Sequence, residues 1–376
     1  MVYNSHMENS TVDRLSRRDF AALTAAAYAF GTRSTAFAAA EGGFALSRAK
    51  TAFADYVKAY WDEVRGQFRL HKKGDKLLDF WFAAHSFDML LDAVRVIGGK
   101  ETKRLAIVFY DGFMKRYPDW KKNESNDDIL WWTIACVRAS RCLGDRRYLA
   151  QAKSLFNHLL AHEVDGELGG GMWWKNSEHK SKNACDNFPA VITACGLHKA
   201  TGDAKYRKAA LDLYAWGREK LFNVKTGAIE DNIDISGKVT HWHFSYNSGT
   251  FIGSALRLWR ITREKVYLDD AFLAAKYMTT SLSRDGVLKP TGQGDGGAFN
   301  GIGIRYLCEL AQTAEGTTFR EFVRGNAESV WRNRRKSDGL PGPDWTRVPA
   351  DDFDIEGQTA NSGLVALVLV AGMKGK

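Results

Sequence analysis

The segment NDDILWWTIACVRA, residues 126–139, opens with two adjacent acids and continues as an almost unbroken apolar run. After its first three residues, only Thr133 and Arg138 are polar. A helix that is apolar around its whole circumference is buried on all sides. The segment therefore predicts a helix in the interior of the protein, with Asp127 and Asp128 in its first turn.

The segment that follows is amphipathic, and the same succession recurs along the chain. A Gly-Asp break at 144–145 is followed by Tyr148, and a second break at 202–203 is followed by Tyr206. Asp203 is a residue type that favours the N-cap position, and apolar residues recur at helical spacing after it. These segments predict outer helices that lay one face on a core.

Counting both kinds of segment predicts twelve helices in the chain. Their expected ranges are 47–70, 78–97, 101–117, 127–143, 145–162, 183–200, 203–222, 246–261, 264–281, 298–313, 317–333 and 358–372. Buried and amphipathic helices in alternation, with a weak internal repeat, are typical of six helical hairpins closed in a ring. The sequence thus predicts an all-α fold, an (α/α)6 barrel, in one catalytic domain over residues 44–376.

The composition narrows the range of partners and cofactors. The chain has 376 residues, and its 53 Lys and Arg exceed its 44 Asp and Glu without forming a basic run, so we expect no nucleic-acid partner. Five cysteines without a C-x-x-C pair predict buried free thiols in place of disulfides or a zinc site. No cofactor loop or metal-ligand set stands out, and we expect a monomer that needs neither cofactor nor metal.

The first forty residues have the character of an export signal. Arg17 and Arg18 resemble a twin-arginine motif, an Ala-rich apolar stretch covers 20–31, and residues 36–38 offer an A-x-A cleavage site. The last apolar run, 363–373, is shorter than the ~20 residues that span a bilayer. We expect removal of residues 1–40 and a periplasmic or secreted protein without membrane insertion.

Polar and aromatic residues gather at the starts of the predicted inner helices. If helices alternate in direction around a ring, all inner helices begin at the same end of the barrel, so these residues become neighbours. The starts are Asp79-Phe80-Trp81, Asn126-Asp127-Asp128, Asp186-Asn187, Tyr246-Asn247, Asp295-Gly296-Gly297 and Gln358-Thr359. Carboxylates, amides and indoles that converge in this way are typical of a carbohydrate site.

Each of these positions also has a purely structural interpretation. Asp, Asn and Gln at helix starts are common N-caps, and the Trp131-Trp132 and Trp173-Trp174 pairs are equally compatible with core filling. Capping needs only one such residue per helix, however, so the pair Asp127-Asp128 carries more acid than a cap requires.

The order of these motifs resembles glycoside hydrolase family 76, the endo-α-1,6-mannanases, over roughly residues 75–310. The motifs are Asn126-Asp127-Asp128 with Trp131, Gly169-Gly170-Gly171-Met172-Trp173-Trp174, Lys182-Asn183-Ala184 with Asn187 and Pro189, Thr226-Gly227 with Asp231, Tyr246-Asn247 with Gly249-Thr250, and Asp295-Gly296-Gly297 with Phe299, Gly301, Arg305 and Tyr306. The resemblance implies an (α/α)6 barrel without a cofactor that hydrolyses α-mannan with retention.

The resemblance also implies roles for individual residues. Asp127 would be the nucleophile and Asp128 the acid/base, while Asp231 would contact the sugar in the −1 subsite. The substrate-binding set is Asp231, Asn187, Tyr246, Asn247, Trp81, Trp131, Trp173, Trp174, Asp295, Phe299 and Arg305. The chain departs from the family pattern at Ser248, Asp186 and Asn300, where Gln, Ser and often Lys are usual.

Three alternatives remain open from the sequence. A cell-wall transglycosylase would use the same two carboxylates with water excluded from the second step. A sugar 2-epimerase on the same barrel would use His241 or His243, and a sugar-binding protein would need no intact acids. Adjacent residues start ~3.8 Å apart at Cα, which favours the ~5 Å carboxyl separation of a retaining pair over the wider inverting gap.

Overall fold

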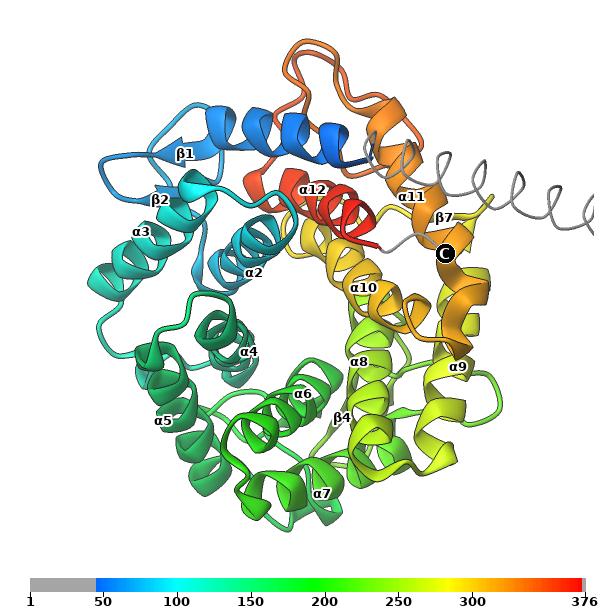
Figure 1. The fold of residues 1–376 in the computed structure, drawn as a ribbon. Coiled ribbons are helices and arrows are strands. Elements are labelled where there is room, and N and C mark those ends of the chain that lie inside the picture. Colours follow the sequence, from blue (N-terminus) through cyan, green and yellow to red (C-terminus); the bar gives the residue numbers. More distant parts are fainter. Residues whose placement is uncertain (1–44, 374–376) are drawn as a thin grey trace, which may run out of the picture. The chain divides into compact units, whose positions relative to one another are not determined.

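The protein, described by a computed structural model over residues 45–373, is a closed ring of twelve helices within that range (Figure 1). The six inner helices pack each against the next, and the last packs back against the first. They are α2 (Phe80–Val96), α4 (Asn126–Cys142), α6 (Ala184–Thr201), α8 (Ser245–Thr262), α10 (Gly296–Ala311) and α12 (Gly357–Ala371). The predicted (α/α)6 barrel is confirmed.

The outer helices cover this ring with one face and leave the other to solvent. They are the helix over residues 45–60, α3 (Lys100–Arg116), α5 (Arg146–His162), α7 (Ala204–Leu221), α9 (Lys265–Thr280) and α11 (Arg320–Asn333). Asp203 caps α7 by accepting a hydrogen bond from the backbone N–H of Lys205 at 3.0 Å, as its residue type predicts.

The first helix ends ten residues earlier than the sequence predicts. It stops at residue 60, and a two-stranded hairpin of β1 (Trp61–Asp62) and β2 (Gln67–Phe68) follows. Gly66 adopts a positive φ of 64° in the turn, a conformation that glycine tolerates and that ends helical geometry. The expectation of a helix through residue 70 was therefore wrong, because a local turn overrides the apolar periodicity.

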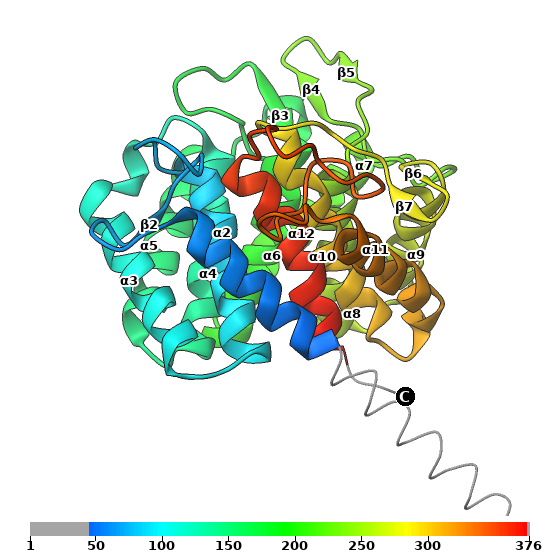
Figure 2. The ribbon, with the colours of Figure 1, turned by 90° about the horizontal axis from the view of Figure 1, so that it is seen from above.

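The remaining strands are short and belong to loops. They are β3 (Ser181–Asn183), β4 (Asn232–Asp234) and β5 (Val239–Thr240) in one antiparallel sheet, with β6 (Ser283–Arg284) and β7 (Val287–Leu288) in a hairpin. The three-stranded sheet stands at the end of the barrel where the inner helices begin (Figure 2). Three single turns of 3-10 helix occupy other connections: η1 (Trp120–Lys122), η2 (Glu167–Gly169) and η3 (Glu315–Phe319).

Aromatic side chains fill the space between inner and outer helices. Trp132 is fully buried, its ring stacks on Phe113 with centroids 4.0 Å apart, and its Nε1 donates to the carbonyl of Phe80 at 2.9 Å. The core-filling interpretation is thus correct for Trp132. No helix among the described residues is long and apolar enough to cross a membrane. The predicted export signal over residues 1–40 lies outside the described residues.

Candidate active site

Two acids stand side by side in the first turn of α4. Ser125 occupies the N-cap position, so neither Asp127 nor Asp128 serves as the cap. Asn123 holds the turn, because its Oδ1 accepts from the backbone N–H of Ser125 at 2.8 Å and its Nδ2 donates to Asp128 Oδ2 at 2.9 Å. Asn123 was not anticipated from the sequence, since it lies in a loop without helical or strand periodicity.

The two acids have different proton affinities. Burial raises the pKa of Asp127 to about 6, against hydrogen bonds from the backbone, the Cys185 thiol and the Trp174 indole that lower it. Burial and then the neighbouring charge of Asp127 raise the pKa of Asp128 to about 8. Near neutral pH, Asp127 is therefore the acid that ionises first, while Asp128 keeps its proton.

A third acid and a thiol lie against Asp127. One ligand-type atom from each of Asp127, Cys185 and Asp186 falls within 4.8 Å of the others, and Asp186 is fully buried. Burial and then the charge of Asp127 raise the pKa of Asp186 well above its usual range, and burial likewise raises the pKa of the Cys185 thiol. These three side chains form a group among the described residues that could hold a metal ion, and metal binding would require them to lose their protons.

Asp231 and Asn247 form a polar pair beside this cluster. Asp231 precedes β4, its Oδ1 accepts from Asn247 Nδ2 at 3.0 Å, and its Oδ2 accepts from Asn232 Nδ2 at 3.0 Å. Burial is the largest cause of the raised pKa of Asp231. The Oδ1 atom of Asn247 is buried without a hydrogen-bond partner among the described residues, which leaves an acceptor for a ligand hydroxyl.

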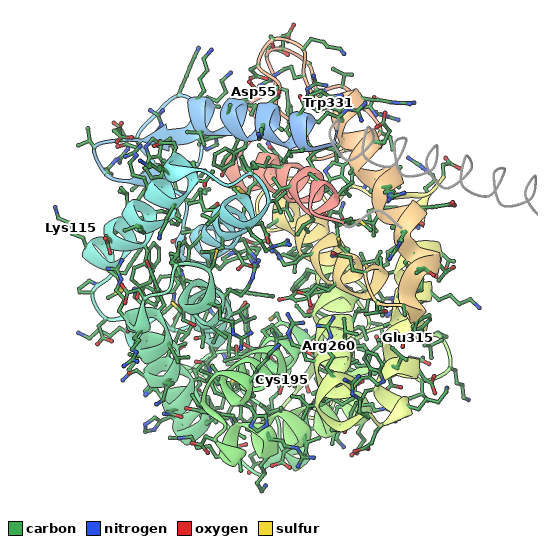
Figure 3. The ribbon with its side chains drawn as sticks, in the orientation of Figure 1. Asp55, Lys115, Cys195, Arg260, Glu315 and Trp331 are labelled. Atoms are coloured by element: carbon green, nitrogen blue, oxygen red, sulfur yellow. The ribbon has the colours of Figure 1, made fainter. Side chains whose placement is uncertain are left out.

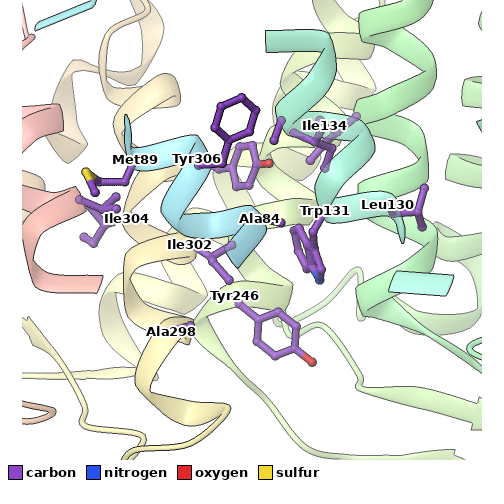
Figure 4. Packing of buried hydrophobic residues seen from close by; sticks show 14 of the residues in the cluster. Ala84, Met89, Leu130, Trp131, Ile134, Tyr246, Ala298, Ile302, Ile304 and Tyr306 are labelled. Carbon is purple, nitrogen blue, oxygen red and sulfur yellow. The ribbon is translucent and has the colours of Figure 1, made fainter. Parts of the chain in front are cut away.

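Aromatic rings lie close to these polar groups. The Tyr246 ring stacks on Phe299 with centroids 4.1 Å apart, and the charges of Asp231, Asp127 and Asp186 all act on its hydroxyl. In Figure 4 the Tyr246 and Trp131 rings reach toward the same region from α8 and α4. Apolar faces next to carboxylates and amides can cover the C–H surface of a sugar while the polar groups bind its hydroxyls.

Comparison with known proteins places this arrangement in a family. The model of glycosyl hydrolase family 76 matches residues 45–371. The chain belongs to that family, and it is a glycoside hydrolase. A comparison with curated proteins gave no match.

Family 76 enzymes also dominate the similar solved structures. An α-1,6-mannanase from Salegentibacter sp. HEL1_6 is 32% identical, with 88% of this chain and 99% of that chain covered and a TM-score of 0.83. An inactive variant of it, with two adjacent aspartates replaced by asparagine, was solved with α-1,6-mannotriose at 31% identity, the same coverage and the same TM-score. A protein from Listeria innocua is 28% identical, with coverages of 87% and 97% and a TM-score of 0.81.

The two tryptophans of the family 76 glycine-rich motif have different surroundings. Trp174 is half-buried, its indole donates to Asp127, and Lys175 Nζ lies 4.9 Å from its ring centroid. Trp173 is buried, and its Nε1 donates to Asp165 Oδ2 at 2.6 Å. Its ring stacks on His179 and is covered by Lys182 Nζ at 4.3 Å. The substrate-binding prediction for Trp173 therefore gives way to a structural role.

Asn187 also has a structural role, because all its polar atoms are used within the protein. Its Oδ1 accepts from the backbone N–H of Met172 at 2.7 Å, and its Nδ2 donates to the carbonyls of Met172 and Asn183. The glycines of the same loop allow it to pack closely, since a Cβ on Gly171, at φ 81°, would lie 2.5 Å from the Trp216 ring. Asn187 therefore positions the loop that carries Trp174.

Arg305 lies in the interior of the barrel, where its partners do not fit the predicted contact with substrate. It is ten residues beyond Asp295, or roughly 15 Å along the helix. Its guanidinium is buried between two acids of α2, with Nε 3.3 Å from Asp88 Oδ2 and an ion pair to Asp92. The residue type favoured substrate binding, but the partners supplied by α2 make it part of the barrel's internal ion network.

The predicted residues at the rim are joined by a hydrogen bond across helices. The Trp81 indole donates to Asp295, whose pKa is raised mainly by burial, and Trp81 lies 6.4 Å from the Phe299 ring. The charges of Asp79 and Asp295 both act on Asp128. These contacts bring Trp81, Asp295 and Phe299 to the same end of the barrel as the acid pair.

Two of the departures from the family pattern are buried and have different environments. Asn300 accepts from Ser245 Oγ at 2.7 Å and donates to the carbonyl of Lys289 at 3.0 Å, so it ties α10 to α8. Ser248 is buried, and its Oγ has no partner among the described residues. The histidines of the epimerase alternative instead contact Glu230 Oε2, His241 at 2.9 Å and His243 at 3.0 Å.

Proposed function

We propose that this enzyme hydrolyses α-1,6-mannosidic bonds within a mannan chain, with retention of the anomeric configuration. The observation that carries the proposal is the pair Asp127-Asp128, two adjacent half-buried acids whose pKa values are raised to about 6 and about 8. Further support comes from the Salegentibacter α-1,6-mannanase, in which replacing two adjacent aspartates gave an inactive variant. Family 76 membership supplies the glycoside hydrolase chemistry.

The split in proton affinity matches the two roles of a retaining mechanism. In the first step, ionised Asp127 attacks the anomeric carbon as the glycosidic C–O bond breaks, and Asp128 gives its proton to the leaving oxygen. A covalent mannosyl ester on Asp127 results. In the second step, Asp128 takes a proton from water as the water oxygen attacks the anomeric carbon, which breaks the ester and restores both acids.

The surrounding groups fit a sugar in the subsite next to the acids. Asn247 is held by its hydrogen bond to Asp231, and its Oδ1, unpartnered among the described residues, can accept a hydrogen bond from a sugar hydroxyl group. The rings of Tyr246, Trp131 and Phe299 offer apolar faces to the sugar. The Trp174 indole donates to the nucleophile itself, so it keeps the Asp127 carboxylate oriented. The sugar is thus bound both by polar groups and by rings.

Incubation with linear α-1,6-mannan tests both the linkage and the mechanism. Chromatography should show a series of short oligosaccharides from the start, which is the pattern of endo cleavage, and mannose alone would contradict it. Proton NMR at early times should show the α-anomer of the new reducing end first. A first-formed β-anomer would contradict retention, and products longer than the substrate would favour the transglycosylase.

We also propose that the enzyme is exported and acts as a monomer. Twin-arginine and A-x-A features in the first forty residues support export. N-terminal sequencing of the protein from a periplasmic fraction should begin between residues 39 and 41. Recovery of the full-length chain from the cytoplasm alone would contradict export, and a dimer mass in light scattering would contradict the monomer.

A further inference from the structure

A basic pocket lies on the outer wall of the barrel, apart from the acid pair. It has a volume of about 490 Å³ and is formed by the helix over residues 45–60, the segment after β2 and the segment after α11. Figure 3 marks this region by Asp55 on the first helix and Trp331 on α11. Seven of its lining residues are cationic: Lys58, Arg69, Lys72, Lys73, Arg334, Arg335 and Lys336.

Only two acids line the pocket, so its formal charge is 7 − 2, or +5. One of them, Asp338, is fully engaged by Arg335 at 2.7 Å and Lys72 at 2.6 Å. The other, Asp55, packs against the loop, since a Cβ on Gly339 would lie 2.1 Å from its Oδ2. Asp55 makes no ion pair with a described residue, and its charge faces Lys58 and Arg334, so the two acids offset only part of the positive charge.

Five cations of the pocket make no ion pair with a described residue. They are Lys58, Arg69, Lys73, Arg334 and Lys336, whereas Lys72 and Arg335 pair with Asp338. The Nε atom of Arg69 is buried without a hydrogen-bond partner. A donor that is both buried and unpartnered is costly unless a ligand completes it.

The pocket has a rigid base. Arg335 is 3% exposed, and besides Asp338 its NH1 donates to the carbonyls of Ala350 and Phe353 at 3.0 and 2.6 Å. A guanidinium held by four or more partners keeps its neighbours on the loop in fixed positions. Arg335 therefore gives the pocket a fixed base, around which the exposed side chains of Lys58, Lys72, Lys73 and Lys336 are arranged.

A neutral mannan gives no reason for this charge. Like charges in a concave space repel one another, and only an anion relieves that repulsion. We propose that the pocket binds a phosphate group, either as free phosphate or as a phosphate monoester carried by a glycan. Three or more cations around a tetrahedral dianion provide charge-assisted hydrogen bonds to each of its oxygens.

The pocket is linked to the catalytic end of the barrel through one segment. His71, next to Lys72, lies 2.8 Å from Asp354, and Glu356 accepts from the backbone N–H of Gly294 at 2.6 Å. Gly294 directly precedes Asp295. This segment is the route along which a phosphorylated glycan would reach from the pocket toward the start of α10.

Titration calorimetry with inorganic phosphate at constant ionic strength tests the site itself. Wild type should bind one phosphate per chain, and the combined variant Lys58→Gln, Lys73→Gln and Lys336→Gln should bind it at least tenfold more weakly. The matched control Lys153→Gln, Lys199→Gln and Lys225→Gln removes three exposed lysines from the far side of the ring, near α5, α6 and α7, and should bind as wild type does (Figure 1). Absent binding, or an equal loss in the control, overturns the proposal.

A hydrolysis assay distinguishes free phosphate from a glycan-borne phosphate as the ligand. It compares two α-1,6-mannan oligosaccharides, one neutral and one with a phosphate monoester. Only this assay rests on the proposed function. A glycan-borne ligand gives a lower KM for the phosphorylated chain in wild type and equal KM values in the pocket variant. A free-phosphate ligand gives equal KM values in both proteins. Activity on the neutral chain should be unchanged by the pocket substitutions, so a failed hydrolase assignment leaves the calorimetric result intact.

Discussion

The inner helices carry two sets of acids, and only one set has cationic partners. Further along the helices, Asp88 and Asp92 of α2 pair with Arg138 of α4 and Arg305 of α10. At the helix starts that form the candidate active site, Asp127, Asp128 and Asp186 make no ion pair with any described residue. The same helices thus carry one neutralised set of acids and one set that is left without countercharge.

The difference has opposite effects on proton affinity. Burial alone would raise the pKa of Asp92, but Arg138 and Arg305 lower it below the ordinary value, so Asp92 is always ionised at working pH. Without such cations, burial raises the pKa values of Asp127 and Asp128 into the neutral range. Paired acids therefore hold the barrel together, whereas unpaired acids are available to exchange protons.

The largest effect is expected from removing either unpaired acid. Asp127→Asn and Asp128→Asn should each lower kcat/KM on α-1,6-mannan by ~10³-fold or more, because each is required for the covalent step. The Tm of each variant should be unchanged or slightly higher, since an acid held away from water without a countercharge destabilises the fold. In the control variant Asp92→Asn we expect the opposite result, with a lower Tm as the main effect and a smaller change in kcat/KM. Near-wild-type activity in both Asp127→Asn and Asp128→Asn would contradict the assignment of these two acids as the catalytic pair.

Breaking the paired set of acids should cost stability. Arg305→Ala leaves Asp88 and Asp92 buried without one of their three arginines, Arg95, Arg138 and Arg305, and we expect a loss of ~3–5 kcal/mol in the free energy of unfolding. Denaturant titration measures it. Arg332→Ala, which removes an exposed pair with Glu328 at 2.6 Å, is the control and should cost less than ~1 kcal/mol. A loss as small as the control's would show that the network contributes little.

The same contrast separates the two neighbouring tryptophans. Trp173→Ala removes a buried ring and should cost ~3–5 kcal/mol of stability, with activity of the folded fraction retained. Trp174→Ala removes a hydrogen bond to Asp127 and should lower kcat/KM by about 10- to 100-fold with a small change in Tm. Unfolding curves and kinetics on both variants decide the point. The reverse result would exchange the two roles.

The sequence predicted what depends on local pattern. Apolar runs predicted the inner helices, Gly-Asp breaks predicted two of the outer ones, and the excess of acid in Asn126-Asp127-Asp128 marked the candidate catalytic turn. It did not predict what depends on distant partners. Arg305 finds Asp92 across 213 residues, and Cys185 meets Asp127 only when α6 packs beside α4. Trp173 and Trp174 are adjacent residues of the same type after the same glycine-rich run, so only their surroundings in the fold distinguish their roles.

A small effect is expected from the third acid. Asn has the shape of a protonated carboxyl group, and Asp186 is held protonated by burial and by the charge of Asp127. Asp186→Asn should therefore keep kcat/KM within a few-fold and move the acidic limb of its pH profile by less than ~0.5 unit. A shift of a full unit toward lower pH would mean that Asp186 is ionised in the active enzyme and repels the charge on Asp127.

The pH dependence of kcat/KM for the wild-type enzyme tests most directly whether unpaired acids carry the chemistry. Activity needs Asp127 ionised, so it should fall as pH drops through about 6, and it needs Asp128 protonated, so it should fall again as pH rises through about 8. The two limbs belong to the coupled pair as a whole. A bell-shaped pH profile of kcat/KM with limbs near pH 6 and pH 8 supports the assignment of Asp127 and Asp128. A profile that stays flat from the ordinary carboxyl range up to alkaline pH would contradict it.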